Sequence, residues 1–407
     1  MRGSNTNKTV RSVCVVGAGT RFLSGMTYYT FSLCNALSDH YDVSAILMRQ
    51  LLPTVLYPGR KRVGAPITTT KLAPSIPYFD GIDWYWVPTL VRAFRFMVRR
   101  RPDVLVFQWW TGTILHSYVA LALIARLLGT KIVIEFHEVL DTGEARLQPV
   151  NAYAGVVGRL LVRLTDGFVI HTVTDYPELD RQYRLGNRPV ALIPRGPLDE
   201  YKRDEGIRMK RGAPESCCNL LFFGVIRPYK GLEYLIQAFD SIPPDEIDRY
   251  WLTVVGETWE VWEDTTLPGE LIARSRYRDR ITFVNDYVSD ADIAAYLAGA
   301  DAVVLPYVRS SVSGPLHTAM SHGLPVVVTN VGGLPEAVAG YDGAILVPPR
   351  DIGALCEALG QVGRLRGKHF ADPHSWDRTV ARFGALFDAL EGHPEALKEA
   401  GALVSHK

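Results

Sequence analysis

The 407-residue sequence has few cysteines, and their spacing excludes several classes of protein. There are five, an odd number with no CxxC pair: Cys14, Cys34, Cys217, Cys218 and Cys356. This scatter argues against a disulfide framework and against a structural zinc site. Because it is typical of a reducing compartment, we expect a cytoplasmic protein.

Long apolar runs are also missing. The strongest candidate, YVALALIARLLG at 118–129, is too short to span a bilayer and carries Arg126, so we expect a buried helix there. The first residues, MRGSNTNKTVRS, lack the apolar core of a signal peptide. The sequence therefore predicts neither a membrane span nor secretion.

One segment keeps a peripheral membrane contact open. LVRAFRFMVRRRPD at 90–103 interleaves arginine with Phe, Met and Val. It is either a surface helix that ends before Pro102 or a basic amphipathic helix whose residues 90–101 contact the inner face of a membrane.

Excess charge is absent, since the formal net charge is +1. The chain as a whole therefore exerts no electrostatic pull on nucleic acid. An anionic ligand has to be held by local cations and backbone amides.

Apolar runs alternate with helical segments, and the alternation occurs twice. The charged stretch near residue 200, LDEYKRDEGIRMKRGAPESC, has weak periodicity and is interpreted as a linker. Strands are predicted before it at 11–19, 41–48, 102–110, 130–138, 166–173 and 188–196, and after it at 219–226, 250–257, 280–286, 300–307, 324–330 and 343–349. Helices are predicted at 25–37, 90–101, 113–128, 231–239, 289–300 and 374–392, with Ser289 and Asp292 in capping-box spacing and Ser375 as an N-cap.

Two such series predict an α/β protein with two Rossmann-like, doubly wound domains that face each other across a cleft. We place the N-terminal domain at 1–198, the second domain at 199–373, and a final helix and tail at 374–407. Ligands of these sheets bind at the carboxyl ends of the strands, so the cleft is the expected active site.

The first glycine-rich loop, VVGAGTRFLSG at 15–25, does not fit a dinucleotide fingerprint. GxGxxG requires glycine at position 22, which is Phe22, and the second strand ends in Met48 and Arg49 rather than an acid. A nicotinamide or flavin site is therefore the weakest alternative. Gly25 instead precedes a helix, whose N-terminal amides favour an anion.

The loop FFGVIRPYKG at 222–231 is more informative. Gly224 ends a strand, and Arg227 and Lys230 follow before a helix. Two cations beside a helix N-terminus form a pyrophosphate clamp and would stabilise a departing nucleoside diphosphate; the alternative is a pair of solvated surface cations.

Six motifs, in this order, resemble those of the retaining GT-B glycosyltransferases, and specifically the GT4 family (glycosyl transferases group 1). They are the Gly25 loop, IEFHE around His137, LIPRG at 192–196, FGVIRPYKG, LTVVGE at 252–257 and SSVSGPLHTAMSHGLPVVVTNVGGLPE at 310–336. The likeness covers nearly the whole chain and implies the GT-B fold. The terminal SWDRTVARF resembles the family's closing helix, which crosses back onto the first domain, and the second domain would bind the donor and the first the acceptor.

The resemblance implies catalytic roles for three residues. His137 matches the histidine near the anomeric centre, with Glu138 and Asp141 close behind it in sequence. Arg227 and Lys230 match the pair that binds the diphosphate. Arg195 falls where many relatives have asparagine, which leaves its role open.

The resemblance also implies a set of donor-binding residues. Gly25 would lie beside the diphosphate or the acceptor, and Gly224 would allow close approach of the backbone. Tyr287 and Val288 match the loop that holds the nucleobase. Ser313 and Gly314 match residues whose amides meet the phosphates.

The sequence departs from the common family pattern at two acidic positions. Two glutamates separated by seven residues are replaced by Ser310 and Thr318, whose hydroxyls can bind sugar without charge. Ser310, Ser313 and Gly314 match an SxxSG variant within the wider group, so we interpret the change as altered donor specificity rather than decay. An inactive protein remains the alternative.

Trp109 and Trp110 stand at the end of a predicted strand. Neighbouring strand residues point to opposite faces, so one indole is a candidate platform for an acceptor, and core packing is the alternative.

Together these features predict a retaining hexosyltransferase. It would move a sugar from a nucleotide-diphosphate sugar to a hydroxyl of a glycan, glycolipid or natural product, with no cofactor and no metal, because no DxD-type metal motif is evident in the right context. The alternatives are a GT-B-type nucleotide-sugar epimerase and a non-catalytic nucleotide-sugar-binding protein. The base, the sugar and the acceptor are not specified by the sequence.

Overall fold

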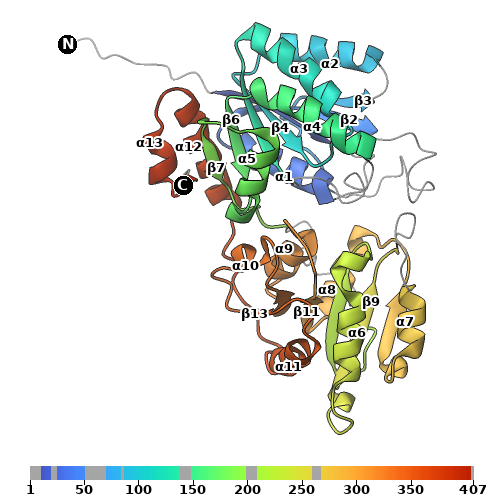
Figure 1. Cartoon of the computed structure of the whole chain (residues 1–407). Helices are drawn as coiled ribbons and strands as arrows, with labels where there is room; N and C mark the ends of the chain where they lie inside the picture. The colour runs from blue at the N-terminus through green and yellow to red at the C-terminus, as the bar shows by residue number, and fades with distance from the viewer. Residues whose placement is uncertain are drawn as a thin grey trace.

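The protein consists of two parallel β-sheets, each covered by helices on both faces (Figure 1). The computed structural model describes residues 11–19, 25–50, 70–83, 87–137, 148–198, 209–258 and 267–404. The first sheet has the strand order β3-β2-β1-β4-β5-β6-β7 and the second the order β10-β9-β8-β11-β12-β13. This arrangement confirms the predicted α/β fold of two doubly wound units.

All strands except β3 lie close to the predicted apolar runs. The first sheet contains β1 (Ser12–Ala18), β2 (Asp42–Gln50), β3 (Tyr78–Asp83), β4 (Val104–Trp109), β5 (Lys131–Phe136), β6 (Gly167–Ile170) and β7 (Val190–Leu192). The second contains β8 (Cys218–Phe223), β9 (Tyr250–Val255), β10 (Ile281–Val284), β11 (Ala302–Leu305), β12 (Val326–Thr329) and β13 (Ala344–Val347).

Helices connect these strands. Around the first sheet lie α1 (Gly25–Ser38), α2 (Val87–Arg100), α3 (Leu115–Leu128), α4 (Gln148–Arg163) and α5 (Tyr176–Tyr183), and around the second α6 (Leu232–Asp240), α7 (Pro268–Arg274), α8 (Asp290–Gly299), α9 (Gly314–Ser321), α10 (Leu334–Ala337) and α11 (Ile352–Gly363). The chain then continues into α12 (Trp376–Leu390) and α13 (Glu395–Glu399). None of the helices in the described part of the chain has the length and apolarity that a bilayer span requires.

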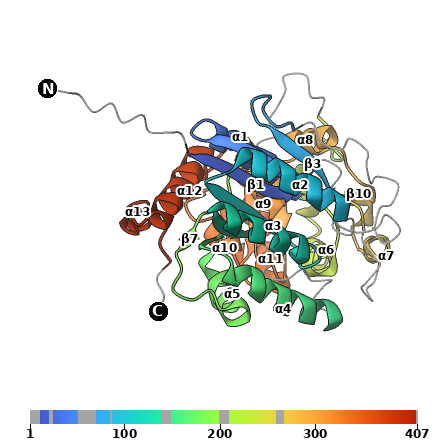
Figure 2. The same ribbon diagram turned by 90° about the horizontal axis from the view of Figure 1, so that it is seen from above.

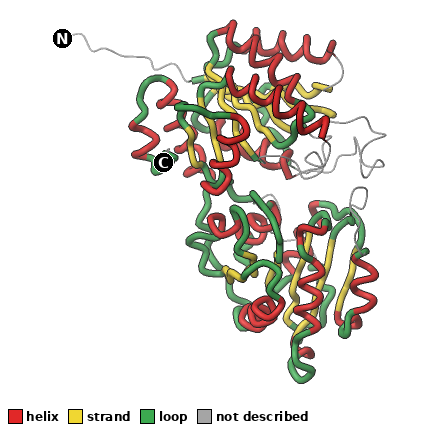
Figure 3. The backbone as a smooth tube through the Cα atoms, in the orientation of Figure 1, coloured by secondary structure: helices red, strands yellow, loops and turns green. Residues whose placement is uncertain are grey.

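Alternating side chains divide the first sheet into two buried layers. On β1, Cys14 and Val16 face the core under α2, α3 and α4, whereas Val13 and Val15 face the core under α1 and α12. A strand buried on both faces needs a continuous apolar run, as the sequence SVCVVGA provides. Figure 3 shows helices on both sides of the strands in both domains.

The C-terminal helices belong to the first domain. Phe383 and Phe387 of α12 are fully buried in the core beneath α1, and Leu403 forms an antiparallel bridge with Ala191 of β7. The Ser375 hydroxyl accepts a hydrogen bond from the amide of Arg378, which confirms the predicted N-cap. In Figure 2, α12 and α13 lie on the side of the molecule opposite α6 and α7.

The predicted capping box of α8 is half formed. The Ser289 hydroxyl accepts from the amide of Asp292, as expected. The Asp292 carboxylate, however, pairs with Lys210, 2.5 Å away, in the segment that leads into the second domain. Asp292 therefore also fixes the position of the chain before β8 through its ion pair with Lys210.

Candidate functional site

The strand order of the second sheet reverses between β8 and β11. In doubly wound sheets this switch point opens the crevice that binds ligands. Gly224 and Lys230 follow β8, and Tyr307 and Ser313 follow β11. The residues predicted from the FGVIRPYKG motif therefore lie at the position where the topology places a ligand.

Lys230 and Gly224 are in close contact at this point. Gly224 has φ +99°, and a Cβ built on it would lie 3.3 Å from Lys230 Nζ and 3.3 Å from the Pro315 ring in the first turn of α9. Lys230 Nζ also lies 5.6 Å from the centroid of the Tyr307 ring. The ammonium group is thus held between the backbone after β8 and the N-terminus of α9.

Lys230 is a buried cation without a counter-charge. Among the described residues no carboxylate lies within ion-pair distance of its amine, and its side chain is only 8% exposed. Burial, together with the positive charge of Arg227, lowers the pKa of Lys230 to about 7. An anion placed here would compensate both cations, so the arrangement is suited to a diphosphate.

The N-terminus of α9 adds backbone donors to the same place. The Ser313 hydroxyl caps the helix by accepting from the amide of Leu316, 3.2 Å away. Gly314, the first helical residue, leaves the approach open because its added Cβ would meet only Leu198, 3.7 Å away. The helix dipole at this end favours an anion.

Ser310 and Thr318 take different positions around this helix. Ser310 is half-buried, and its hydroxyl bonds to no other described residue. Its carbonyl accepts from the amide of Gly333, 3.3 Å away, which fixes the loop. Thr318 is buried and donates its hydroxyl proton to the carbonyl of Gly314, 3.0 Å away, so towards a ligand it offers lone pairs rather than a proton.

Tyr287 and Val288 follow the edge strand β10. Both are half-buried, and the Tyr287 amide donates to the Asp286 carboxylate, 2.7 Å away. They lie at the same carboxyl edge of the sheet as Gly224, because β10 pairs in parallel with β9 and β9 with β8. Gly25 is the first residue of α1, and the loop before it, residues 20–24, lies outside the described residues, as do Glu138 and Asp141.

His137 directly follows β5 in the first domain and belongs to a buried network. Its Nδ1 lies 3.0 Å from Nε2 of His171, which follows β6, and its Nε2 lies 3.4 Å from a carboxyl oxygen of Glu135. Glu135 also accepts from the Tyr29 hydroxyl at 2.6 Å and lies 3.1 Å from the Gln108 amide nitrogen. Both ring nitrogens of His137 therefore face protein groups.

The proton positions in this network follow from its acceptors. His171 Nδ1 lies 2.8 Å from the carbonyl of Ile193, so this nitrogen carries a proton. Burial lowers the pKa of His171 to about 3. The pKa of His137 lies well below its usual value, mainly because the ring is buried and also because Arg195 is positively charged. With both rings neutral, His137 donates through Nδ1, and its Nε2 lone pair faces Glu135.

Glu135 is best accommodated as a neutral acid. Burial raises the pKa of its carboxyl. The Thr30 hydroxyl lies 2.7 Å from the carbonyl of Met26 and 2.5 Å from Gln108 Oε1, although its one proton can serve only one acceptor. If the Gln108 amide is turned over, its nitrogen donates to Thr30 and its oxygen accepts a proton from Glu135, which satisfies Thr30 and Gln108 and leaves the Nε2 lone pair of His137 without a donor among the described residues.

Glu135, His137 and His171 are also the one group of metal-type ligands in the described part of the chain, with donor atoms within 4.8 Å of one another. The hydrogen bonds just described already engage the Glu135 carboxyl and both nitrogens of His171. Hydrogen bonds within the protein explain the arrangement of these three residues more simply than a bound metal ion does.

This network predicts that the protein loses stability in acid. His137, His171 and the buried His317 of α9 all have lowered pKa values, so their contribution to stability is complete above about pH 6.5 and declines as the pH falls towards the folded pKa. Each contributes about 1.4 kcal/mol per pH unit in that window. Glu135 acts in the opposite direction, because a raised carboxyl pKa stabilises at low pH and this contribution is lost as pH rises.

The loss of stability from the three histidines in acid is larger than the gain from Glu135. We therefore expect the free energy of unfolding to fall by on the order of 3 kcal/mol between about pH 6.5 and about pH 5. Urea denaturation across this range measures it. An unfolding free energy that stays constant would show that these histidines are not buried as neutral rings.

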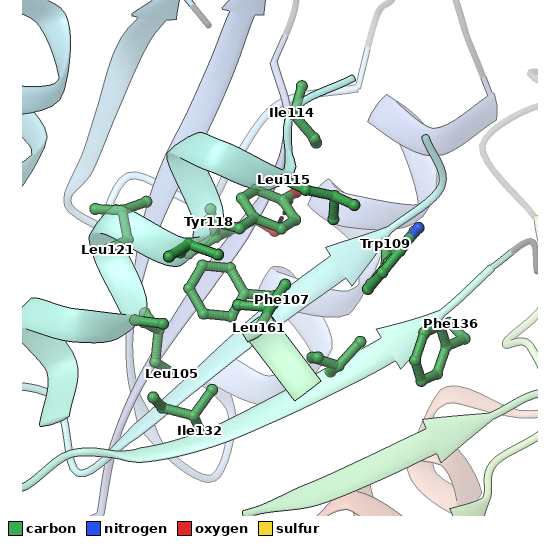
Figure 4. Packing of buried hydrophobic residues seen from close by; sticks show 14 of the residues in the cluster. Leu105, Phe107, Trp109, Ile114, Leu115, Tyr118, Leu121, Ile132, Phe136 and Leu161 are labelled. Carbon is green, nitrogen blue, oxygen red and sulfur yellow. Dashed lines mark hydrogen bonds between the residues drawn. The ribbon is translucent and has the colours of Figure 1, made fainter. Parts of the chain in front are cut away.

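The structure does not support the tryptophans as acceptor platforms. Trp109 is 1% exposed and packs against Phe136 (Figure 4) and against Tyr183. Trp110 is also buried and belongs to the same core as Trp109. The expected alternation fails because β4 ends at Trp109, so Trp110 already lies in the turn before α3.

The two domains also enclose a cavity of about 190 Å³ beside this network. His171 and Arg195 line it from the first domain, and His317 and Glu336 from the second. The Glu336 carboxylate accepts from the amides of Val173 (2.7 Å) and Thr174 (3.1 Å) across the interface. Lys230 and Arg227 do not line this cavity, whereas Ser311 and Val312 of the loop before α9 do.

Sequence reasoning missed Glu135 and His171. Glu135 stands two residues before His137, on the same strand, and His171 directly follows the predicted strand at the carboxyl edge. A polar side chain inside the apolar run KIVIEF was the available signal, because such a group requires buried partners.

Comparisons with known proteins identify the family of this chain. Residues 217–363 match the family described as "Glycosyl transferases group 1", and residues 24–196 match the "Glycosyl transferase 4-like domain". The chain belongs to the group 1, GT4-type glycosyltransferases. The matched ranges contain His137 in one domain and Arg227 and Lys230 in the other.

Two relatives illustrate how far the likeness extends. The O-antigen chain mannosyltransferase B of Escherichia coli is 30% identical over 171 residues, which is 40% of this chain and 43% of that protein, so the match spans less than half of that relative. The D-inositol 3-phosphate glycosyltransferase of Streptomyces scabiei is 26% identical over 371 residues, 81% of each protein.

Solved structures share the fold of this glycosyltransferase. Sucrose-phosphate synthase from Thermosynechococcus elongatus superposes with a TM-score of 0.63 at 18% identity, covering 96% of this chain and 97% of that one. HepE of Anabaena, solved in complex with UDP, superposes with a TM-score of 0.58 at 14% identity, covering 96% and 98%. These neighbours confirm the GT-B architecture predicted from the six motifs.

Proposed function

We propose that this glycosyltransferase transfers a sugar from a nucleotide-diphosphate sugar to an acceptor hydroxyl, with retention of anomeric configuration and without a metal. The observation that carries the proposal is Lys230, a buried cation facing Arg227 at the switch point of the second sheet. The N-terminus of α9 lies beside it. A diphosphate is the anion that two cations and a helix N-terminus are suited to hold.

The reaction balances without a protein nucleophile. The bond between the anomeric carbon and the phosphate oxygen breaks, and a bond from the acceptor oxygen to the same carbon forms on the same face. The acceptor's proton moves to the departing diphosphate, whose charge Arg227 and Lys230 stabilise.

The carboxyl beside His137 is poorly placed for covalent catalysis. Retention by double displacement needs an ionised carboxylate at the anomeric carbon. Glu135 is fully buried, hydrogen-bonded to Tyr29, and has a raised pKa. Its role in the proposal is to orient His137, so same-face transfer is preferred.

Retention and metal independence are tested together. We expect proton NMR of the first-formed product to show the anomeric configuration of the donor, and EDTA to leave the rate unchanged, because protein cations supply the charge compensation. An inverted product, or a rate abolished by EDTA and restored by a divalent ion, would contradict the proposal. Donor turnover without acceptor would indicate an epimerase, and binding without turnover a non-catalytic protein.

The proposed acceptor is a hydroxyl of a glycan, glycolipid or natural product. The names of the relatives, a mannosyltransferase of O-antigen chains and an inositol phosphate glycosyltransferase, support an alcohol acceptor. Peripheral contact of residues 90–101 with a membrane is part of the proposal, since α2 buries Leu90, Ala93 and Met97 and exposes its arginines. Such contact would bring the enzyme to a lipid-borne acceptor.

A further inference from the structure

Three neighbouring helices of the first domain form a basic face without acidic residues. α2, α3 and α4 cover the same side of the first sheet, opposite α1 and α12 (Figures 1 and 2). Their sequences contain no Asp, Glu or Lys. They contain seven arginines: Arg92, Arg95, Arg99, Arg100, Arg126, Arg159 and Arg163.

The same helices expose an unusual number of large aliphatic side chains. Leu127 is 82% exposed, and Val87 and Val156 are each 69% exposed. More than half of the exposed large hydrophobic side chains in the described part of the chain lie on these helices: Val87, Val91, Val98, Leu123, Leu127, Val156 and Leu160. Single exposed aliphatics are ordinary, but a group on adjacent helices marks an interaction surface.

Helix stabilisation accounts for only part of the basic face. Arg99, Arg100, Arg126 and Arg163 lie in last turns, where a cation stabilises the helix dipole. Arg100 and Arg126 are further paired with Asp42 and Asp166.

Arg159 donates a hydrogen bond to the carbonyl of Gln182, 2.9 Å away, but the two arginines in the middle of α2 have no such explanation. Arg92 and Arg95 lie in the middle of α2, are exposed, and form no ion pair with any described residue. Arg99, in the last turn of α2, is also exposed and forms no ion pair with any described residue, although its charge stabilises the helix dipole. Three arginines without an ion pair therefore lie on one face of α2, beside Val91 and Val98. Their combination with aliphatic side chains is what an interfacial helix presents to a bilayer.

We propose that the outer surface of α2, α3 and α4 docks on an anionic lipid bilayer. The arginines bind phosphate-bearing headgroups, and the aliphatic side chains enter the boundary between headgroups and acyl chains. Charge complementarity selects this partner. A second copy of the same face would oppose arginine to arginine, and nucleic acid would leave the aliphatic side chains in water. The net charge of +1 makes the attraction local to this face.

Docking would place the cleft at the level of the headgroups. The layer of helices is parallel to the first sheet, so a bilayer on these helices lies along the sheet. The carboxyl edge of the sheet, where His137 lies, then opens sideways along the membrane surface. This rests on the proposed function, because only a membrane-borne acceptor benefits from such an orientation.

The test is co-sedimentation with vesicles of phosphatidylcholine, alone or mixed with phosphatidylglycerol. Each arginine near an anionic surface strengthens binding about fivefold. We therefore expect Arg92→Glu/Arg95→Glu/Arg99→Glu to weaken binding to the mixed vesicles by more than about a hundredfold. The matched control is Arg249→Glu/Arg364→Glu/Lys368→Glu, which makes the same change in charge at exposed positions of the second domain and should bind as wild type.

The aliphatic part of the surface is tested by Val91→Ser/Leu127→Ser, which should remove the binding that persists at high salt. The proposal is wrong if wild type binds both vesicle types equally, if face and control variants lose binding alike, or if the triple variant instead dissolves a dimer seen by light scattering. The thermal shift that nucleotides produce should be unchanged in all variants, which separates this surface from the donor site.

Discussion

Replacing Lys230 with methionine should lower kcat/KM by about 10²–10³-fold. Methionine keeps the bulk of the buried chain between Gly224 and Tyr307 but removes the charge that faces the departing diphosphate. Most of the loss should appear in kcat, because charge develops on the diphosphate as the glycosidic bond breaks. Initial rates over a range of donor concentrations measure both parameters.

Unfolding does not explain this loss, because burial of a charged lysine opposes folding. The pKa of Lys230 is lowered to about 7, so the variant should be at least as stable as wild type. Lys368→Ala, at an exposed lysine of the same domain, is the control and should keep full activity. Wild-type kinetics in Lys230→Met would remove the diphosphate assignment.

Replacing Glu135 with alanine should cost about 3–5 kcal/mol of unfolding free energy. The Tyr29 hydroxyl and the Gln108 amide would lose their partner in a site with no access to water. A cavity would also remain beside His137. Urea denaturation measures the loss, and the rate of transfer should fall as the orientation of His137 is released.

The variant Glu135→Gln tests whether the Glu135 side chain is a neutral acid or an ionised carboxylate. A glutamine can accept from Tyr29 and donate to a turned Gln108 or to His137 Nε2, so stability should change by less than about 1 kcal/mol. Activity should remain within about threefold of wild type. If Glu135→Gln were as damaging as Glu135→Ala, the carboxyl would have to be ionised and His137 charged.

Most of the fold follows from apolar runs bounded by turn residues. β8 and β9, for example, carry NLLFF and YWLTVV, which are interpreted without ambiguity. β3 was missed because YFDGID contains two acids and a glycine, and only pairing with β2 makes it a strand. α4 was missed because Gly155 and Gly158 weaken its pattern. Gly158 is needed there, since a Cβ would approach Trp109 to 2.6 Å.

The grouping of the candidate diphosphate-binding residues could be predicted because they are close in sequence. Gly224, Arg227 and Lys230 lie within one loop, and the motif contains the chemistry. The network around His137 could not, because Tyr29, Glu135 and His171 come from α1, β5 and β6. They meet only after the parallel pairing of β5 with β6 is known.

The hydroxyl pair that replaces two acids remains a prediction about specificity. The Ser310 side chain is half-buried and unengaged within the described residues, so it can contact a sugar. The Thr318 hydroxyl already donates its proton to the carbonyl of Gly314. Ser310 is therefore the better position at which to change donor preference.

A thermal-shift panel of UDP, GDP, TDP and ADP tests the central claim most directly. A ligand that binds only the folded state stabilises it by about 2.7 kcal/mol at a hundredfold excess over Kd. The account predicts that at least one of these diphosphates raises the melting temperature of wild type and that Lys230→Met removes the rise. No shift with any of them, or an equal shift in Lys230→Met, would contradict it.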